Sequence, residues 1–294
     1  MDPLLRLAVI MALCPAPSVL LFFLISRKRR LDRAQAASHQ VRRRPAGESF
    51  REELERLDEQ LNEWLIYLAI CPAIVGISAA LLNVPGIMVW AGLFGAAVVW
   101  SGVCAVKLSR LNGKRAEAEL QFEGCRSVAV ELDRLAAEGF EIYHDLPFDG
   151  FNLHHVLLGP PGLYVIETMT HCQTAMAATA GQPQAEFDGF RVNWPSGSES
   201  YGLETAVTRA DALAQWLSGS LGETIEATPV LTLPGWAVHC SGSNQSVMVL
   251  NSREIGKLCD SRIVRLNEDL IRRICHHLNQ KCGARPAFIP FSAD

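Results

Sequence analysis

Long apolar runs without a charged residue fall in the first third of the chain, and shorter runs follow. Three of them, residues 7–25, 64–82 and 86–106, are each about as long as a helix that crosses a bilayer, which needs roughly 20 residues at about 1.5 Å per residue. The uncharged residues 83–85 leave room for a short turn. The pattern therefore predicts three transmembrane helices, of which the second and third form a hairpin.

Basic residues mark one side of these runs. Residues 27–30 are all Arg or Lys and follow the first run, and Lys107 follows the third. Because basic flanks stay on the cytoplasmic side, we expect an outside N-terminus and a cytoplasmic C-terminal part, as in a bacterial plasma-membrane protein. A cleaved signal peptide is the alternative for residues 1–26, but its charge would precede the apolar run, so an uncleaved anchor is favoured. The basic stretch 27–44 marks topology or binds anionic lipid.

After residue 117 the pattern changes to short segments with helical and strand periodicity. Leu120, Val128 and Leu132 recur at helical spacing and predict a helix over 117–137. The Gly-Pro-Pro-Gly turn at 159–162 predicts a hairpin. The order helix, three strands, helix, strand indicates an α/β fold with one mixed sheet flanked by helices. The other expected segments are strands 140–144, 153–158, 163–168, 186–194 (broken at 188–189), 229–233 and 247–250, a loop over 195–202, and helices 204–221 and 265–281.

Apolar pattern and charge together divide the chain into five parts. Residues 1–116 have 15 Lys and Arg against 9 Asp and Glu, whereas residues 117–294 have 12 against 22, a net charge of −10. Since nucleic-acid affinity depends mostly on phosphate neutralisation, an acidic domain is a poor generic nucleic-acid binder. The nine cysteines include no C-x-x-C pair and indicate reduced thiols. The expected parts are a first transmembrane helix (1–26), a cytoplasmic basic and amphipathic segment (27–63), a transmembrane hairpin (64–107), a soluble domain (117–255), and a C-terminal helix and tail (256–294).

The segment FNLHHVLLGPPGLYVIETMT, residues 151–170, resembles the core of the nuclease-related domain (NERD) family. The family pattern there is N-I-D-H-V, a G-P turn, and a strand that ends in V-I-E-T-K. Supporting matches are Phe-Asp-Gly at 187–189, Pro-Gly-Trp at 234–236 and Val-Leu-Asn at 249–251, so the resemblance covers roughly residues 120–255. It implies that residues 117–255 are a NERD-like domain with a restriction-endonuclease-like fold, descended from enzymes with a PD-(D/E)xK site.

The chemistry of such a site defines the residue types it needs. Phosphodiester hydrolysis requires an Asp and a second carboxylate that converge on Mg²⁺ or Mn²⁺, which polarises the phosphate and activates a water. A Lys two residues beyond the second carboxylate points to the same face of the strand and stabilises developing charge. In this chain the family's Glu is kept as Glu167 and its His as His155. Four other positions differ: His154 replaces Asp, Met169 replaces Lys, Cys125 after Gly124 replaces Glu, and Thr208 replaces Gln.

These replacements predict a degenerate site in which catalysis is impaired. The alternative is a rebuilt metal site, in which His154 and Glu167 on adjacent strands bind Zn²⁺ or Mn²⁺ with His171 and Cys172 nearby. Otherwise His154 is a hydrogen-bonded remnant and Glu167 pairs with a neighbouring side chain. Successive helix positions diverge by about 100°, so a further group is expected on the surface of the last helix rather than around one ion: Cys275, His276, His277 and Cys282.

The sequence therefore predicts a membrane-anchored, cytoplasm-facing protein of nuclease-related type that is catalytically impaired and binds nucleic acid or protein. The first alternative is a metal-dependent nuclease with Glu167 and His154 as its catalytic residues. The second is a membrane scaffold or sensor without a nucleic-acid role. The expected partners are the lipid bilayer and a nucleic acid or protein. No small-molecule cofactor is expected, and Mg²⁺ or Mn²⁺ is expected if the site is active.

Overall fold

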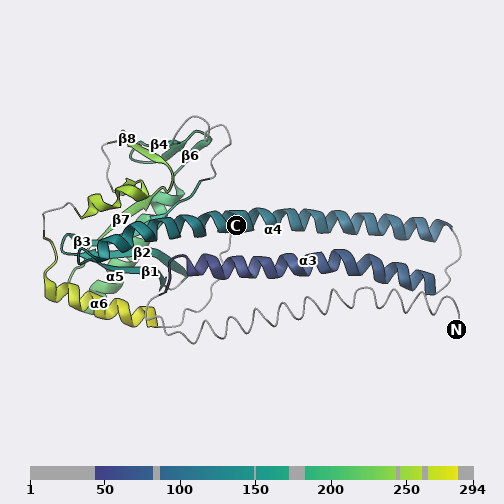
Figure 1. Cartoon of the computed structure of the whole chain (residues 1–294), viewed down its shortest axis with the longest axis horizontal. Helices are drawn as coiled ribbons and strands as arrows, with labels where there is room; N and C mark the ends of the chain where they lie inside the picture. Colours follow the sequence, from purple (N-terminus) through teal and green to yellow (C-terminus); the bar gives the residue numbers. More distant parts are fainter. Residues whose placement is uncertain are drawn as a thin grey trace. The chain divides into compact units, whose positions relative to one another are not determined.

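A computed structural model describes residues 44–81, 87–148, 150–171, 183–242, 246–259 and 264–283 (Figure 1). The chain divides into two compact units. One contains Met1–Val41 and Leu54–Ala116, and the other contains Arg42–Glu53 and Glu117–Asp294. The expected first transmembrane helix (1–26), nearly all of the basic stretch 27–44 and the turn at 83–85 lie outside the described residues.

Two long helices contain the apolar runs that the described residues include. Helix α3 (Glu48–Leu81) begins with the expected amphipathic segment and continues into the second apolar run, and α4 (Ile87–Ala136) contains the third. Within the described part of the chain, one helix, Ala91–Ala136, is long and apolar enough to cross a membrane, and 6% of its most apolar window is buried. Phe94 and Val99 on this helix expose 72% and 68% of their surface. The prediction of three transmembrane helices is therefore not confirmed.

The unit that contains Glu117–Asp294 is built on a five-stranded mixed sheet with the strand order β1-β2-β3-β7-β9. β1, β2 and β3 are antiparallel, whereas β7 and β9 run parallel to β3. Gly159 and Gly162 pair across the expected Gly-Pro-Pro-Gly turn and close the β2–β3 hairpin. The predicted order helix, three strands, helix, strand holds for the elements of this sheet, but three further strands lie between β3 and the second helix of that order. The bounds are β1 (Glu141–Phe148), β2 (Phe151–Gly159), β3 (Gly162–Thr168), β7 (Ala227–Thr232) and β9 (Met248–Leu250).

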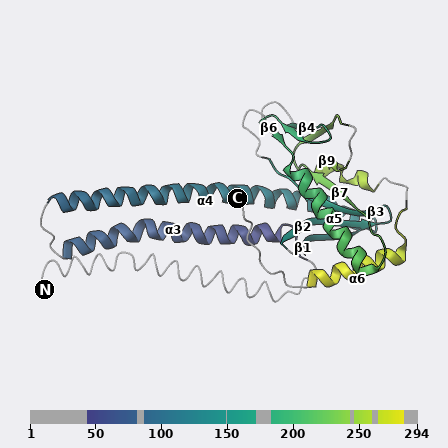
Figure 2. The same cartoon turned by 180° about the vertical axis from the view of Figure 1, so that it is seen from behind.

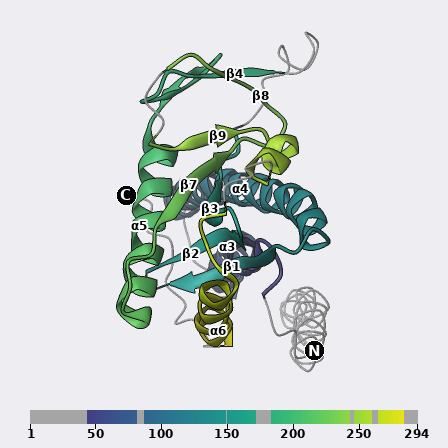
Figure 3. The same ribbon diagram turned by 90° about the vertical axis from the view of Figure 1, so that its left-hand side faces the viewer.

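Helices cover both faces of this sheet (Figures 2 and 3). α5 (Tyr201–Leu221) and α6 (Glu268–Gly283) pack on one face, where Leu213 of α5 joins an apolar cluster with side chains of β1, β2 and β3. The last part of α4 and the 3-10 helix η1 (Ser252–Leu258) pack on the other face, in a cluster that contains Leu132. The chain therefore forms an α/β fold with a helical layer on each side of the sheet.

A second, four-stranded sheet has the order β6-β5-β4-β8, so the prediction of a single mixed sheet is wrong. The strand expected over 186–194 is a hairpin, because the Asp188 carboxylate accepts the backbone N–H groups of Phe190 and Arg191 and turns the chain. The loop expected over 195–202 contains a strand and the start of α5. The bounds are β4 (Gln184–Phe187), β5 (Val192–Trp194), β6 (Gly197–Glu199) and β8 (Ala237–Cys240).

Candidate functional site

Glu167 is a buried carboxylate near the end of β3, the middle strand of the five-stranded sheet, with 3% of its surface exposed. Its Oε2 atom accepts a hydrogen bond from Nη1 of Arg209 on α5 and lies 3.1 Å from Nδ1 of His154 on β2. Its Oε1 atom is buried and has no hydrogen-bond partner among the described residues. The structure thus brings together His154 and Glu167, the two site residues that the sequence predicts.

Arg209 is a member of this site that the sequence prediction missed. Its guanidinium group pairs with Glu167, and its Cζ atom lies 5.5 Å from the centre of the Phe151 ring. Arg209 lies on the buried side of α5 with Ala206 and Ala210. A charged residue on an otherwise apolar helix face is the sequence signal that could have identified it.

His154 is a neutral imidazole with a defined proton position. The backbone N–H of Thr168 donates to Nδ1 of His154 over 3.1 Å, so the proton of the neutral ring is on Nε2. Burial, and then the positive charge of Arg209, lower the pKa of His154 to about 3. The ring also contacts Phe50 of α3 edge-on, with 5.3 Å between the ring centres. At neutral pH His154 is therefore an uncharged hydrogen-bond acceptor at this site.

Glu167 titrates close to neutral pH. Burial raises the pKa of Glu167 to about 7, although the charge and hydrogen bond of Arg209 and the backbone N–H of His154 oppose the shift. Perturbed carboxyl groups of this kind are concentrated at functional sites, although buried ion pairs also produce them. The arrangement can therefore hold or release a proton at Oε2 of Glu167, next to the unprotonated Nδ1 of His154.

Met169 and Thr208, which the sequence resemblance aligns with the family's Lys and Gln, do not contribute to this polar group. Met169 is buried in an apolar cluster with Leu231, and a Cβ atom added at Gly202 would lie 2.6 Å from its Sδ atom. Thr208 is exposed, and its Oγ1 donates to the carbonyl oxygen of Glu204. The described structure therefore has no lysine-like donor at position 169 and directs the Thr208 hydroxyl to its own helix.

The Gly124–Cys125 step of α4 lies beside the end of β3. A Cβ atom at Gly124 would lie 2.2 Å from Cγ2 of Thr170, so glycine permits the close approach of helix and strand. Cys125 is the residue that the sequence resemblance aligns with the family's Glu. Burial raises the pKa of its thiol to about 12, although a side-chain hydrogen bond with Thr168 opposes the shift. The thiol stays protonated and adds no charge to the site.

A second buried carboxylate, Asp145, lies on β1 between the residues that pair with His155 and Leu153 of β2. Ser49 at the start of α3 donates to it twice, from its backbone nitrogen over 3.0 Å and from its Oγ over 2.5 Å. Nδ2 of Asn152 donates to it over 3.4 Å, and Nη2 of Arg44 lies 3.3 Å away. Asp145 therefore anchors the first turn of α3 to the sheet, and all of these residues belong to the same compact unit.

His155, the histidine that matches the family pattern, is buried and takes part in a separate chain of polar side chains that ends at the exposed Asp133. Its Nδ1 atom lies 2.8 Å from Nδ1 of His144, whose Nε2 atom lies 3.2 Å from Oδ1 of Asp133. Burial holds the pKa of His155 well below its ordinary value, so the ring is neutral. This chain connects α4, β1 and β2 and is a structural link rather than an extension of the Glu167 site.

The other predicted ligands do not join Glu167. His171 stacks on Trp194 with 4.7 Å between ring centres, and its Nε2 lies 2.7 Å from Oγ of Ser196. Cys172 lies outside the described residues. Among the residues that the structure describes, no set of three or more His, Cys, Asp or Glu side chains is placed to hold a metal ion. The remaining predicted group lies on α6: Cys275, His276, His277 and Cys282.

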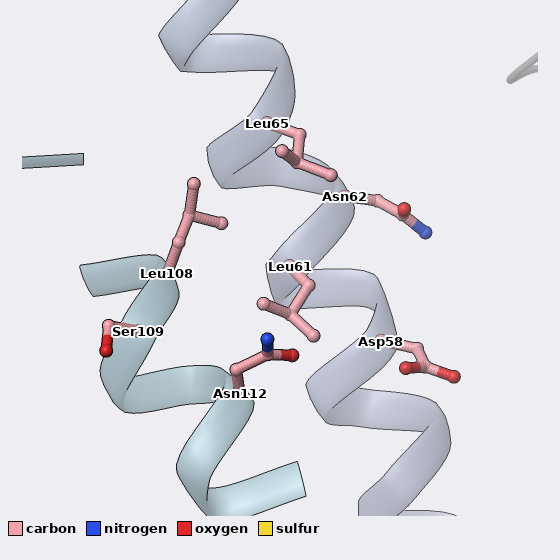
Figure 4. Close-up of a pocket in the computed structure, with 7 residues that line it drawn as sticks. All are labelled: Asp58, Leu61, Asn62, Leu65, Leu108, Ser109 and Asn112. Carbon is pink, nitrogen blue, oxygen red and sulfur yellow. The ribbon is translucent and has the colours of Figure 1, made fainter. Parts of the chain in front are cut away.

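A pocket of about 440 Å³ lies on the other unit, along α3 and α4 (Figure 4). Leu61 and Asn112 point into the space between the two helices, and Asp58, which also lines the pocket, pairs with Arg115 of α4 over 2.8 Å. The lining combines aliphatic, amide and hydroxyl groups with one carboxylate and includes none of the predicted site residues. The pocket is lined by Asp58, Leu61, Asn62, Leu65, Leu108, Ser109 and Asn112.

Comparison with known proteins gives one family match. The search of curated proteins and the search of solved structures found no match. Residues 120–234 match the model of the family described as NERD, nuclease-related domain. The matched segment includes His154, Glu167 and Arg209. The match supports the NERD family for this part of the chain.

Proposed function

We propose that this chain is an integral membrane protein whose nuclease-related domain faces the cytoplasm, has lost metal-dependent hydrolysis, and acts by binding nucleic acid or protein. The order of helix, three antiparallel strands, helix and parallel strand supports a restriction-endonuclease-like fold for the domain. The resemblance to the family gives Glu167 and His154 the positions of the family's Glu and Asp, and the structure has them 3.1 Å apart.

The observation that carries the loss of catalysis is the burial of Met169 among apolar side chains. A phosphodiesterase of this type needs a cationic donor on the strand that carries its second carboxylate. It also needs an Asp carboxylate that converges with this Glu carboxylate on the metal ion. Asp145 is already bonded by Ser49 and Arg44, and His154 stands where the family has its Asp. Glu167 is left without the partners that hydrolysis requires.

A cleavage assay tests this proposal on the full-length protein in lipid nanodiscs, with labelled single- and double-stranded DNA and RNA in Mg²⁺ or Mn²⁺. Glu167→Gln, prepared identically, controls for contaminating nuclease. We expect no difference in cleavage between the two proteins. Cleavage by the parent that disappears in Glu167→Gln would contradict the loss of catalysis.

One observation favours a second candidate function, a metal nuclease with a rebuilt site. Nδ1 of His154 and Oε2 of Glu167 lie 3.1 Å apart, and two neighbouring ligands of one ion are roughly 3.0–3.4 Å apart when each bond is about 2.1 Å and the angle between the bonds is about 90–109°. The same cleavage assay with Zn²⁺ and Mn²⁺ separates the two functions. Activity that requires both Glu167 and His154 would establish the second.

Two features of α3 and α4 support the membrane anchor. The apolar window of α4 is almost entirely exposed, unlike that of a helix in the core of a soluble protein. Trp64, Tyr67 and Trp100 also form a group in which Trp100 Nε1 donates to the Tyr67 carbonyl oxygen over 3.3 Å, and Nζ of Lys107 lies 5.9 Å from the Trp64 ring. Aromatic and basic residues gather in this way where a helix leaves the bilayer.

Cysteine labelling tests the cytoplasmic orientation. Cys240 is an exposed free thiol in the nuclease-related domain. A membrane-impermeant maleimide should label it in permeabilised cells and not in intact cells, with Cys240→Ser as the control for the other thiols. Labelling of Cys240 in intact cells would place the domain outside.

The acidic charge of residues 117–294 favours a protein partner over non-specific nucleic-acid binding. Retention of labelled DNA or RNA by the nanodisc-bound protein at low salt distinguishes these partners. Retention that falls with salt supports a nucleic-acid partner. Absence of retention at low salt supports a membrane scaffold or sensor without a nucleic-acid role.

A further inference from the structure

We propose that Arg209 is the permanent cation of the Glu167 site, where its guanidinium group takes the place of a divalent metal ion and keeps such an ion out. The inference deepens the proposed loss of metal catalysis and rests on it. The presence of Arg209 then contributes to the loss of metal-dependent hydrolysis, in addition to the replacement of the family's Asp and Lys.

The first step is the occupancy of the Glu167 carboxylate. Oε2 already accepts a hydrogen bond from Nη1 of Arg209, and this pair is buried, with 10% of the Arg209 side chain and 3% of the Glu167 side chain exposed. A buried carboxylate requires a cationic or hydrogen-bonding partner, because water does not solvate it. Arg209 meets this requirement without an added ion.

The second step is the state of the neighbouring nitrogen. Nδ1 of His154 is the atom closest to Oε2 that could serve as a metal ligand, at 3.1 Å. A neutral imidazole nitrogen has one lone pair, and the backbone N–H of Thr168 already donates to it. A metal ion at this position would have to break a hydrogen bond between the two strands.

The third step is electrostatic. An ion bound between Oε2 and Nδ1 would be adjacent to the guanidinium of Arg209, in a site with little solvent screening. The positive charge of Arg209 already contributes to the low pKa of His154. A divalent ion at the same place would be repelled in the same way and more strongly, because its charge is larger.

The fourth step concerns the ligands that remain. Oε1 of Glu167 is buried and has no partner among the described residues, so the carboxylate could accept a second bond. Among the described residues, no three His, Cys, Asp or Glu side chains are placed to hold one metal ion. Removal of the Arg209 charge would leave an unpaired buried carboxylate next to an imidazole nitrogen, which is a nitrogen–oxygen pair that suits Mn²⁺ or Zn²⁺.

Metal binding to the full-length protein in nanodiscs tests the inference. Mn²⁺ is the probe, detected by electron paramagnetic resonance and calorimetry, because the free cysteines of the chain would bind Zn²⁺. The series is the parent, Glu167→Gln, Arg209→Lys, Arg209→Gln and the double variant Arg209→Gln/Glu167→Gln. Arg273→Gln is the matched control, since it removes an Arg–Glu pair with Glu223 at the exposed surface.

We expect Mn²⁺ binding at least tenfold tighter in Arg209→Gln than in the parent, with the gain absent from the double variant, from Arg209→Lys and from Arg273→Gln. Mn²⁺ should also raise the unfolding temperature of Arg209→Gln and leave that of the parent unchanged. Folded Arg209→Gln that gains no affinity would overturn the inference. So would parent protein that binds one Mn²⁺ and loses it in Glu167→Gln.

The comparison of parent with Glu167→Gln decides the question even if Arg209→Gln does not fold. Parent protein without Glu167-dependent Mn²⁺ binding supports the inference, and parent protein with such binding refutes it. The readout is metal binding rather than cleavage. Mn²⁺ binding that contradicts the role of Arg209 therefore leaves the proposed binding function intact. Glu167-dependent cleavage by the parent would instead refute the proposed loss of catalysis.

Discussion

Two buried carboxylates on neighbouring parts of one sheet, Asp145 and Glu167, have opposite environments. Asp145 receives two hydrogen bonds from Ser49, with Asn152 and Arg44 as further partners. Glu167 receives one side-chain donor, Arg209, and keeps an Oε1 atom without a partner among the described residues. Burial alone therefore does not distinguish an anchor from a site; the number of donors around the carboxylate does.

The difference has a direct electrostatic consequence. Burial raises the pKa of both groups, but Ser49, Arg44 and Asn152 all oppose the shift at Asp145. At Glu167 the opposition comes from Arg209 and one backbone N–H, and the pKa reaches about 7. Glu167 is therefore a group that changes its protonation near neutral pH.

Removal of the guanidinium should have the largest effect on stability. Arg209→Gln leaves the Glu167 carboxylate buried without a counter-charge, and we expect it to lower the free energy of unfolding by about 3–5 kcal/mol. Thermal or denaturant unfolding of the full-length protein in metal-free buffer measures this. The exposed pair Arg273–Glu223 provides the control, since Arg273→Gln should cost less than about 1 kcal/mol. Equal losses in the two variants would show that the Glu167 site has no special energetic role.

The pH dependence of stability should separate Glu167 from Asp145. The pKa of Glu167 rises from 4.5 to about 7 on folding, so its contribution is fully present below pH 4.5 and is lost as the pH rises through 7. Glu167→Gln removes this dependence. The stability of the parent relative to Glu167→Gln should therefore fall by roughly 3 kcal/mol between pH 4.5 and 7.5, at about 1.4 kcal/mol per pKa unit.

His154 gives the opposite slope. Its pKa falls from 6.5 to about 3 on folding, so its contribution is present above pH 6.5 and is lost as the pH falls. The two slopes partly cancel in the parent between pH 4.5 and 6.5, and Glu167→Gln should lose more stability on acidification in that range. Parallel curves of unfolding temperature against pH for the two proteins would contradict the raised pKa of Glu167.

The Asp145 anchor can be weakened without a change at Glu167. Ser49→Ala removes the 2.5 Å hydrogen bond from Oγ but leaves the backbone N–H in place. A hydrogen bond to a charged group contributes about 1.5–3 kcal/mol, so we expect a loss of about 2 kcal/mol. Ser220→Ala, whose hydroxyl bonds its own helix at the surface, should change stability by less than about 0.5 kcal/mol. A loss below that of Ser220→Ala would mean that Ser49 is dispensable for the anchor.

The sequence predicted the parts of this site that depend on strand periodicity. His154 and Glu167 lie on adjacent strands because the Gly-Pro-Pro-Gly turn sets the β2–β3 register, and that turn is visible in the sequence. The short apolar run that precedes Glu167 predicted a strand over 163–168, and β3 spans Gly162–Thr168. The helices and strands of the five-stranded sheet followed from the same patterns.

The partners that come from elsewhere in the chain could not be predicted in this way. Arg209 approaches from a helix 42 residues further on, and Ser49 from a helix 96 residues before Asp145. Each contact depends on how a helix packs on the sheet, which local pattern does not encode. The second sheet was missed for a related reason, since β4 and β8 are four-residue strands that pair in parallel across a long separation.

The smallest expected change in stability is that of a Met169 variant, which tests whether Met169 is a core residue or a residue of the Glu167 site. If Met169 is part of the apolar cluster with Leu231, Met169→Leu conserves volume and should cost less than about 1.5 kcal/mol. It should also leave Mn²⁺ binding and nucleic-acid retention unchanged, because neither side chain carries a donor. A loss above about 1.5 kcal/mol would mean that the cluster does not accommodate the branched leucine side chain. A change in either binding measurement would mean that the Met169 thioether contacts the ligand of this site. Met169, which directly follows β3, would then count as a residue of the Glu167 site.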